Sequence, residues 1–294
     1  MTGEPAPVTV VVPTIGRPEL AACLGSLAAC SPRAEEVLVV DQSEGEDVRE
    51  LVESLHRPDF RVVACERRGV AHGTNVGLSL ASRSIVLVTH DDCTVDGAWI
   101  GTAARLMADD PQGILTGRVV PAGDPAHVPS TIDLAEARDY AHGRDFSVLF
   151  PNNMALPRDG ALEFGGFDER IPFAEDNDFC YRWLRAGRRM RYSPLPVVWH
   201  HDWRSRPELE RLYVQYAIGQ GVFYAKHLRQ GDLRIARHVL IDVRAGARGL
   251  LARAVRGRER SSDWRQGVLR GLPIGLVRGW RIFSPRRLRE SESR

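Results

Sequence analysis

The sequence predicts an α/β protein with a mostly parallel sheet and a mixed extension, followed by a C-terminal helical region. Two observations predict this fold class. In the first two thirds of the 294 residues, short β-branched runs alternate with stretches of helical spacing. After residue 203, arginine-rich helical patterns replace the strand signals. We therefore expect one domain over residues 1–205 and a basic helical region over residues 206–294.

Four short apolar runs, bordered by turn residues or charges, are typical of buried parallel strands. They cover residues 8–12, 37–40, 61–64 and 85–89. Helical spacing of leucine and valine predicts intervening helices at residues 18–29 and 46–55, and a short helix at residues 77–82. The less regular part that follows predicts the strands of the mixed extension, at residues 114–120, 153–156, 190–193 and 197–199.

Composition excludes several classes of protein. With 43% hydrophobic and 27% charged residues, the chain has an ordinary globular composition. The five cysteines include no Cys-x-x-Cys pair, which argues against a disulfide framework and against a thiolate zinc site. We find no apolar run long enough for a signal peptide or a membrane span. These features favour a cytoplasmic protein.

The net charge of +2 conceals a strong asymmetry between the two regions. Residues 206–294 contain 20 basic and 8 acidic residues, whereas residues 1–205 contain 20 basic and 30 acidic ones. Lys226 is the only lysine, so nearly all of the basic charge comes from arginine. The two regions therefore differ in the surfaces that they can bind.

Polar residues follow the expected parallel strands, where α/β sheets bind their ligands. Asp91 and Asp92 come directly after the strand at residues 85–89. Adjacent carboxylates repel unless they face water, a cation or a donor. Mg²⁺ or Mn²⁺ would relieve the repulsion, and these ions usually combine one or two carboxylates with phosphate oxygens and water. The pair indicates a metal-held phosphate ester, with a helix N-cap as the alternative.

A second acidic cluster, residues 175–178, precedes an apolar pattern of helical spacing and is expected at a helix start. Capping and the helix dipole explain such a cluster without any function. The functional alternative is a general base, which a transfer reaction needs in addition to the metal. Further along, His200 and His201 end the strand at residues 197–199, where alternation sends their imidazoles to opposite faces. At most one of them is expected at a shared site, and an exposed surface pair is the alternative.

The order and spacing of these motifs resemble the inverting family 2 glycosyltransferases, which have the Rossmann-like GT-A fold. The resemblance runs from about residue 8 to residue 203 and includes an opening strand, a Gly-rich stretch and a DxD-like element at residues 90–92. In this element His90 replaces a frequent first aspartate, and Thr74 stands where the Gly-rich stretch usually has arginine. The resemblance implies that six residues bind the donor: Pro13, Thr14, Arg17, Asp41, Asn75 and Asp91.

The carboxyl half of the resemblance contains the acceptor-side run and the Glu-Asp motif. It places four residues on the acceptor side: Asn153, Gly166, Phe167 and Asp168. It also implies that Asp176 is the general base, with Glu175 as the second candidate, and that Asp92 and His200, rather than His201, hold the metal. Processive members carry a Gln-x-x-Arg-Trp motif. Phe179 replaces its glutamine, which favours a single-transfer enzyme.

The resemblance implies a metal-dependent transfer of a sugar from a nucleotide-diphosphate donor to an acceptor hydroxyl, with inversion at the anomeric carbon. Mg²⁺ or Mn²⁺ is the expected cofactor, and a UDP-sugar or dTDP-sugar is the favoured donor. The two acidic clusters, around Asp92 and Asp176, are expected to meet in one cleft. The acceptor stays open, and a lipid-linked acceptor would fit an enzyme at the inner face of a membrane.

The C-terminal region contains an apolar stripe at steps of three and four residues. The stripe consists of Trp264, Val268, Leu272, Leu276, Trp280 and Phe283. With arginines between its members, it predicts a basic amphipathic helix, although Pro273 and four glycines weaken it. The stripe either lies in a membrane interface or packs on the catalytic domain.

Three other functions have weaker support in the sequence. A sugar-phosphate nucleotidyltransferase shares the general α/β plan but should have a Gly-rich phosphate loop after its first strand, which residues 13–17 lack. The absence of Gly-x-Gly-x-x-Gly also argues against a dinucleotide-binding oxidoreductase. The basic tail raises the possibility of nucleic-acid binding. We expect no nucleic-acid partner, because the tail's aromatics form a helix stripe rather than a stacking platform.

Overall fold

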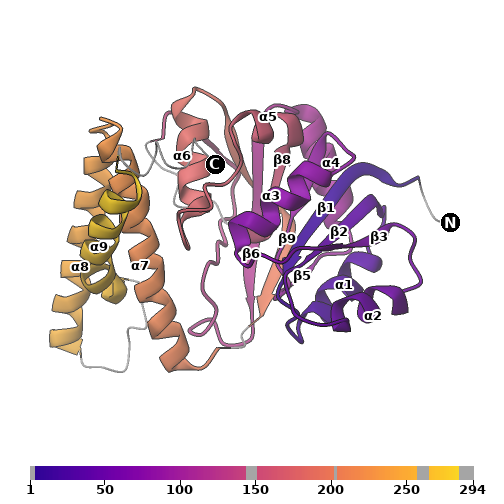
Figure 1. The fold of residues 1–294 in the computed structure, drawn as a ribbon, viewed down its shortest axis with the longest axis horizontal. Coiled ribbons are helices and arrows are strands. Elements are labelled where there is room, and N and C mark those ends of the chain that lie inside the picture. Colours follow the sequence, from indigo (N-terminus) through magenta and orange to yellow (C-terminus); the bar gives the residue numbers. More distant parts are fainter. Residues whose placement is uncertain (1–3, 144–150, 202–203, 257–264, 285–294) are drawn as a thin grey trace. The chain divides into compact units, whose positions relative to one another are not determined.

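The computed structural model describes residues 4–143, 151–201, 204–256 and 265–284 (Figure 1). The chain divides into two compact units. The first consists of Met1–Phe167 and Phe179–Asp202, and the second of Asp168–Asp178 and Trp203–Arg294. The acidic segment at residues 168–178 therefore belongs with the C-terminal helices, although it interrupts the first unit in sequence.

The first unit contains the predicted parallel sheet. Its strands are β1 (Ala6–Thr14), β2 (Ala34–Asp41), β3 (Phe60–Ala64) and β4 (Ile85–Val88). They lie side by side in the order β3-β2-β1-β4, and every neighbouring pair is parallel. The four strands predicted from apolar runs are thus confirmed, and their carboxyl ends meet at one edge of the sheet.

The helices between these strands are α1 (Leu20–Ala28), α2 (Asp47–Ser54) and α3 (Val70–Leu80). The prediction for α3 was too short, because its first two turns contain glycine, threonine and asparagine, which are poor helix formers. The glycines allow the helix to approach β1 closely. A Cβ on Gly77 would collide with the Val11 side chain, and one on Gly73 would lie 2.9 Å from Cβ of Pro13.

The mixed extension continues the sheet beyond β4. Antiparallel β8 (Met154–Pro157) pairs with β4 and with β6 (Ile114–Ala122), and β6 pairs in parallel with β9 (Met190–His201). The prediction of two separate strands at residues 190–193 and 197–199 was wrong. Both belong to β9, because the ladder with β6 shifts register and absorbs residues 194–196 without ending the strand.

Several shorter elements complete the first unit. The strands β5 (Cys93–Val95) and β7 (Arg138–Tyr140) both pair antiparallel with β9. The helices α4 (Trp99–Asp109) and α5 (Arg158–Glu163) and a 3₁₀ turn at Pro151–Asn153 lie between strands in the sequence. Among the described residues, the nine strands follow the order β3-β2-β1-β4-β8-β6-β9-β5, with β7 beside β9.

The core of the first unit follows strand alternation. Val8, Val10 and Val12 of β1 are buried in one cluster with apolar residues of α1, α2 and α4. Val11 points to the opposite face, against Gly77 of α3. Helices therefore cover both faces of the parallel part, which explains why its strands are apolar throughout.

The part of the second unit that follows β9 is mostly helical, as predicted for the C-terminal region. It contains α7 (Arg206–Arg229), α8 (Ile235–Arg256) and α9 (Arg265–Ile282). A capping box begins α7, in which the Ser205 backbone N–H and hydroxyl both donate to Oε2 of Glu208, at 2.8 and 2.5 Å. None of the described helices is long and apolar enough to cross a bilayer.

Helices α7 and α9 pack through small residues. The glycines of α9 recur every fourth residue at positions 267, 271, 275 and 279, and a Cβ on any of them would collide with α7. Gly275, for example, lies against Ile218 and Gly221 of α7. The glycines that weaken the helix in isolation therefore form its packing face, since they let the two backbones approach closely.

The apolar stripe predicted on this helix divides between packing and exposure. Val268, Leu272 and Phe283 are buried, whereas 53% of Trp280 is exposed. Leu276 is intermediate, and Trp264 lies outside the described residues. Most of the described stripe is thus used for packing inside the second unit.

Candidate functional site

The first group of candidate residues lies at the carboxyl edge of the parallel strands. Thr14 ends β1 and Asp41 ends β2, and the two residues are partners in the ladder. Asp91 and Asp92 follow β4, which pairs with the other side of β1. Four of the residues predicted from the sequence therefore collect at one edge of the sheet.

Asp91 is anchored by two of the predicted donor-binding residues. The Thr14 hydroxyl donates to Oδ2 of Asp91 at 2.7 Å, and Nη1 of Arg17 donates to Oδ1 at 2.6 Å. The same Arg17 nitrogen lies 3.7 Å from Oδ2 of Asp92. Both aspartates are buried, so the guanidinium compensates two carboxylates that would otherwise repel one another.

Asp92 also faces His200. Strand β5, which begins just after Asp92, pairs with β9 in a register that sets Cys93 opposite His200. Oδ2 of Asp92 lies 3.5 Å from Nε2 of His200. His201 points elsewhere, with its Nε2 2.9 Å from Oγ1 of Thr94. Of the two imidazoles, one reaches the aspartate, as strand alternation predicts.

The orientation of the His200 ring suits a metal ligand. Its Nδ1 lies 2.9 Å from the carbonyl oxygen of Pro129. Because a carbonyl only accepts hydrogen bonds, Nδ1 carries a proton, and in the neutral imidazole the lone pair is then on Nε2, toward Asp92. Metal-binding histidines are usually held in this way by a hydrogen bond from the second ring nitrogen.

The surrounding residues fit a divalent cation. Ligand atoms of Asp92, Cys93 and His200 all lie within 4.8 Å of one another, and all three residues are buried. Oxygen and imidazole nitrogen suit Mn²⁺ or Mg²⁺, whereas burial raises the pKa of the Cys93 thiol and keeps it protonated. Nε2 of the nearby His90 is buried without a hydrogen-bond partner in the described part of the chain. Cys93 was not predicted from the sequence as a residue of the metal site. Its position next to Asp92 was the available signal.

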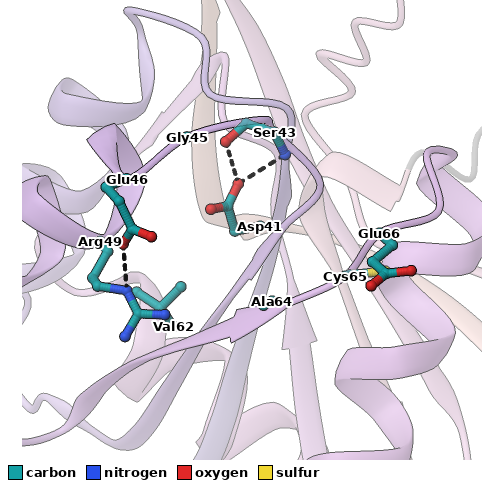
Figure 2. A pocket seen from close by; sticks show the side chains of 9 residues that line it. All are labelled: Asp41, Ser43, Gly45, Glu46, Arg49, Val62, Ala64, Cys65 and Glu66. Carbon is teal, nitrogen blue, oxygen red and sulfur yellow. Dashed lines mark hydrogen bonds and ion pairs between the residues drawn. The ribbon is translucent and has the colours of Figure 1, made fainter.

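Asp41 lines a pocket of about 140 Å³ formed by the ends of β2 and β3 and the start of α2 (Figure 2). Oδ1 of Asp41 accepts hydrogen bonds from the backbone N–H and the hydroxyl of Ser43, at 2.9 and 2.6 Å. Figure 2 shows the ion pair between Glu46 and Arg49, at 2.9 Å, on another wall. The carboxylate of Asp41 is therefore held in a fixed orientation within a concave site.

Two predicted binding residues have their side-chain amides bonded within the first unit. Asn75 donates to the carbonyl of Phe167 at 2.8 Å and accepts from its N–H at 2.9 Å. Asn153 accepts from Nε1 of Trp99 at 2.9 Å and donates to two backbone carbonyls. Gly166 has φ 64°, and a Cβ there would collide with Asn75. These contacts give Asn75, Asn153 and Gly166 a structural role, which is to hold neighbouring backbone segments in place. Their roles in donor and acceptor binding stay predictions.

The second acidic cluster lies, as predicted, at the start of a helix, α6 (Glu175–Arg185). Glu175 is buried and Asp176 partly so. The backbone N–H of Asn177 donates to Oδ1 of Asp176 at 2.7 Å. Burial raises the pKa of both carboxyls, and the carboxylate of Asp176 raises that of Glu175 further. This cluster and Asp92 belong to different units, so their meeting in one cleft stays a prediction.

Two functional candidates in the second unit were missed at the sequence level. Nζ of Lys226 lies 2.8 Å from Oδ2 of Asp168 and 2.8 Å from Oδ2 of Asp178. Nε2 of His227 lies 2.8 Å from Oδ1 of Asp178. The available signal was Lys226 itself, the only lysine in a chain that otherwise uses arginine.

Comparison with known proteins identifies the family. The profile described as glycosyltransferase like family 2 matches residues 5–215, most of the chain. The chain belongs to this family. Among curated proteins, the pre-mycofactocin glycosyltransferases of two Mycobacterium tuberculosis strains are 27% identical over 169 residues, which is 53% of this chain and 34% of the relative. The match thus spans about a third of the length of these relatives.

Solved structures show the same fold. S. aureus TarS 1–349 superposes with a TM-score of 0.56 at 19% identity, over 72% of this chain and 65% of that one. TarS 1–349 in complex with UDP-GlcNAc gives 0.56 at 17% identity, over 72% and 66%. GalNAc-T7 with UDP, GalNAc and Mn²⁺ gives 0.54 at 16% identity, over 75% and 50%. The predicted fold, a GT-A-like α/β sheet with C-terminal helices, is confirmed.

Proposed function

We propose that this chain is a non-processive inverting glycosyltransferase that moves a sugar from a UDP-sugar or dTDP-sugar to an acceptor hydroxyl. The observation that carries the proposal is the pairing of Asp92 with an oriented His200 beside Asp91, at the carboxyl edge of a family 2 sheet. The complexes of similar structures with UDP-GlcNAc and with Mn²⁺ support the same donor class and cofactor.

Asp92 and His200 would hold a Mg²⁺ or Mn²⁺ ion, which when bound neutralises the charge of the departing diphosphate. Arg17 adds a positive charge next to both aspartates, at 2.6 and 3.7 Å. Asp91, fixed by Thr14 and Arg17, would accept a hydrogen bond from a hydroxyl of the donor. These residues bind and orient the donor before transfer.

The pocket at Asp41 would take the nucleobase. A carboxylate accepts hydrogen bonds only, and uracil and thymine both present an imide N–H. Ser43 holds one oxygen of Asp41 and thereby fixes the direction of the other. Pro13 and Thr14 end the neighbouring strand, where they would border the base.

Asp176 would remove the proton of the acceptor hydroxyl as the new bond forms, with Glu175 as the second candidate. Its raised pKa supports this role, because a general base works best when its pKa lies near the working pH. Attack from the side opposite the diphosphate inverts the anomeric configuration. Phe167 and Asp168 precede this cluster in the chain and would border the acceptor, together with Asn153 and Gly166.

The test is a screen of nucleotide sugars with the purified chain, with Mn²⁺, Mg²⁺ or EDTA, followed by nucleotide analysis. We expect metal-dependent release of UDP or dTDP from one donor, and a transferred sugar of inverted configuration by NMR. Formation of nucleoside triphosphate from the donor and pyrophosphate would instead identify a nucleotidyltransferase. Absence of metal-dependent turnover with every donor would contradict the proposal.

The location proposed for the enzyme is the cytoplasmic face of a membrane, with residues 1–205 as the transferase domain and residues 206–294 as the attachment region. Exposed apolar side chains on the basic second unit support it: Leu240, Ile241, Leu250 and Leu251 of α8 and Ile274, Val277 and Trp280 of α9. Basic surfaces with exposed apolar residues bind anionic lipid. Flotation with anionic liposomes should recover the protein, and should fail for the Ile274→Ser/Val277→Ser variant.

A further inference from the structure

One lysine closes the segment that carries the acidic cluster. Asp168 and Asp178 are the first and last residues of the inserted segment 168–178. Nζ of Lys226, in α7, lies 2.8 Å from a carboxylate oxygen of each. The side chains of all three residues are less than a tenth exposed. The ammonium therefore ties together the two ends of the segment 168–178, called the loop 168–178 below, which ends in the first turn of α6 with Glu175 and Asp176.

Two further side chains bond to these carboxylates, the buried His227 and the more exposed Arg170. His227 bonds to the second oxygen of Asp178 through Nε2, at 2.8 Å. Arg170 donates to both oxygens of Asp168 from Nε and Nη2, each at 2.8 Å. Each carboxylate is thus held at both oxygens, which fixes its direction as well as its position.

A second set of hydrogen bonds holds the loop next to Asp176. Asn177 donates from Nδ2 to Oε1 of Gln220 at 2.8 Å, while its backbone N–H donates to Asp176. Nε2 of Gln220 donates to the Tyr224 hydroxyl at 2.8 Å, and this hydroxyl donates to Asp242 of α8 at 2.6 Å. Every hydrogen bond in the series is donated in the direction of Asp242. Because Gln220 uses its amide nitrogen toward Tyr224 and presents its oxygen to Asn177, the amide of Asn177 must present its nitrogen to Gln220 and is fixed in that orientation.

We propose that Lys226 and His227 are positioning residues that hold the loop 168–178, and through it the carboxylate of Asp176, in the geometry needed for proton removal. The inference rests on the proposed function and deepens it. Neither residue touches the acceptor in this role; they act through Asp168 and Asp178. Misplacement of a reacting group by about 1 Å can lower a rate about 10²-fold. Loss of the lysine is therefore expected to reduce kcat and to leave donor binding intact.

The variants are Lys226→Met, which keeps the apolar stem, and Lys226→Arg, which keeps the charge. Because Lys226→Met leaves buried carboxylates without their cation, the double variant Lys226→Met/Asp178→Asn removes one negative charge as well. The matched control is Arg229→Met. Arg229 lies one turn further along α7, bonds to the carbonyl of Phe283 and stacks on Trp280; its link to the loop 168–178 is indirect, through Phe283, whose ring lies against Arg170.

Three measurements are made on each full-length variant: kcat and KM for the donor, UDP affinity by calorimetry with Mn²⁺, and hydrogen–deuterium exchange of the amides at residues 169–177. We expect kcat of Lys226→Met to fall about 10²-fold, with UDP affinity and donor KM unchanged. Exchange should rise at residues 169–177 and stay constant in β1 and β4. Lys226→Arg should recover part of kcat, and Arg229→Met should match wild type.

The double variant separates positioning from charge balance. If the lysine positions the loop, kcat stays low in the double variant even when its melting temperature recovers. Wild-type kcat in the double variant, or unchanged exchange at residues 169–177 in Lys226→Met, would overturn the inference. A wild-type protein that transfers no sugar would instead overturn the proposed function, while the exchange experiment still decides whether Lys226 closes the loop.

Discussion

Nε2 of His200 faces Oδ2 of Asp92 across 3.5 Å, although His200 is the last residue but one of β9 and Asp92 follows β4. The antiparallel pairing of β5 with β9 produces this approach, because it places Cys93, the neighbour of Asp92, directly opposite His200. The Pro129 carbonyl then fixes the ring. The carboxylate oxygen and the imidazole nitrogen are thus held in positions that suit a divalent ion before any nucleotide sugar binds.

Substitution of His200 by alanine is expected to weaken Mn²⁺ binding at least about tenfold. Removal of a residue that only supports a metal ligand already costs about 10- to 100-fold in affinity, and His200 is expected to be a ligand itself. Titration of Mn²⁺ in the presence of UDP, followed by electron paramagnetic resonance, measures the affinity directly. EDTA should abolish sugar transfer, and added Mn²⁺ or Mg²⁺ should restore it.

His201→Ala is the matched control for the metal experiment, because His201 is adjacent but bonds to Thr94 instead. Its Mn²⁺ affinity should equal that of wild type. An equal loss of Mn²⁺ affinity in His200→Ala and His201→Ala would contradict the assignment of His200 as the metal ligand.

Substitution of Asp176 by asparagine should lower kcat about 10²- to 10⁴-fold, the usual contribution of a general base. The donor KM should hardly change, since Asp176 is not expected to contact the diphosphate. Steady-state kinetics with saturating metal measures both. The control is Asp159→Asn, whose carboxylate is exposed and pairs with neighbouring Arg158. Near-normal transfer by Asp176→Asn would remove the base assignment.

The pH dependence of stability should report the buried carboxyls. Burial raises the pKa of Asp176 and Glu175, so the folded state retains protons that the unfolded state releases. Stability is therefore lost as pH rises from the ordinary carboxyl value of about 4 through the raised pKa. Asp176→Asn and Glu175→Gln each remove one of these carboxyls, so the stability of each variant should fall less with rising pH than that of wild type. Their melting temperatures relative to wild type should be higher at pH 8 than at pH 5, and a pH-independent difference would contradict the raised pKa values.

The same raised pKa predicts the rate profile. A general base acts when deprotonated, so kcat/KM should rise with pH well above the ordinary Asp pKa of about 3.9. The position of this acidic limb belongs to the Glu175–Asp176 pair rather than to either residue alone. Initial rates over a series of buffers at constant ionic strength and saturating metal measure it. A flat profile down to pH 5 would be inconsistent with the burial of the pair.

Two glycine substitutions test the packing of α9 on α7. Gly275→Ala should destabilise the protein by about 1–3 kcal/mol, because its Cβ would meet the backbone of α7. Gly25→Ala in α1 should stabilise by about 0.5–1 kcal/mol, since its Cβ would meet nothing within 4 Å. Urea unfolding curves measure both. Equal effects would show that the glycines of α9 are not at a close contact.

Local sequence was sufficient for the elements with strong patterns. The apolar runs of β1 to β4 and the acidic start of α6 were predicted because burial on both faces and the helix dipole leave clear compositional signals. Helix α3 was predicted too short and β9 was divided in two. In both cases tertiary contacts outweighed local preference: glycines of α3 pack on β1, and β9 stays paired with β6 past its prolines.

By itself, the sequence determined the α/β class, the family resemblance and the acidic residues available for metal and base chemistry. It could not determine partners that lie far apart in the chain. The approach of His200 to Asp92, the anchoring of Asn75 on Phe167 and the closure of the loop 168–178 by Lys226 all depend on tertiary structure. The physical reason is that a charged or polar side chain shows no periodicity of its own, and its role is set by which opposite charge or carbonyl the fold brings within about 3 Å.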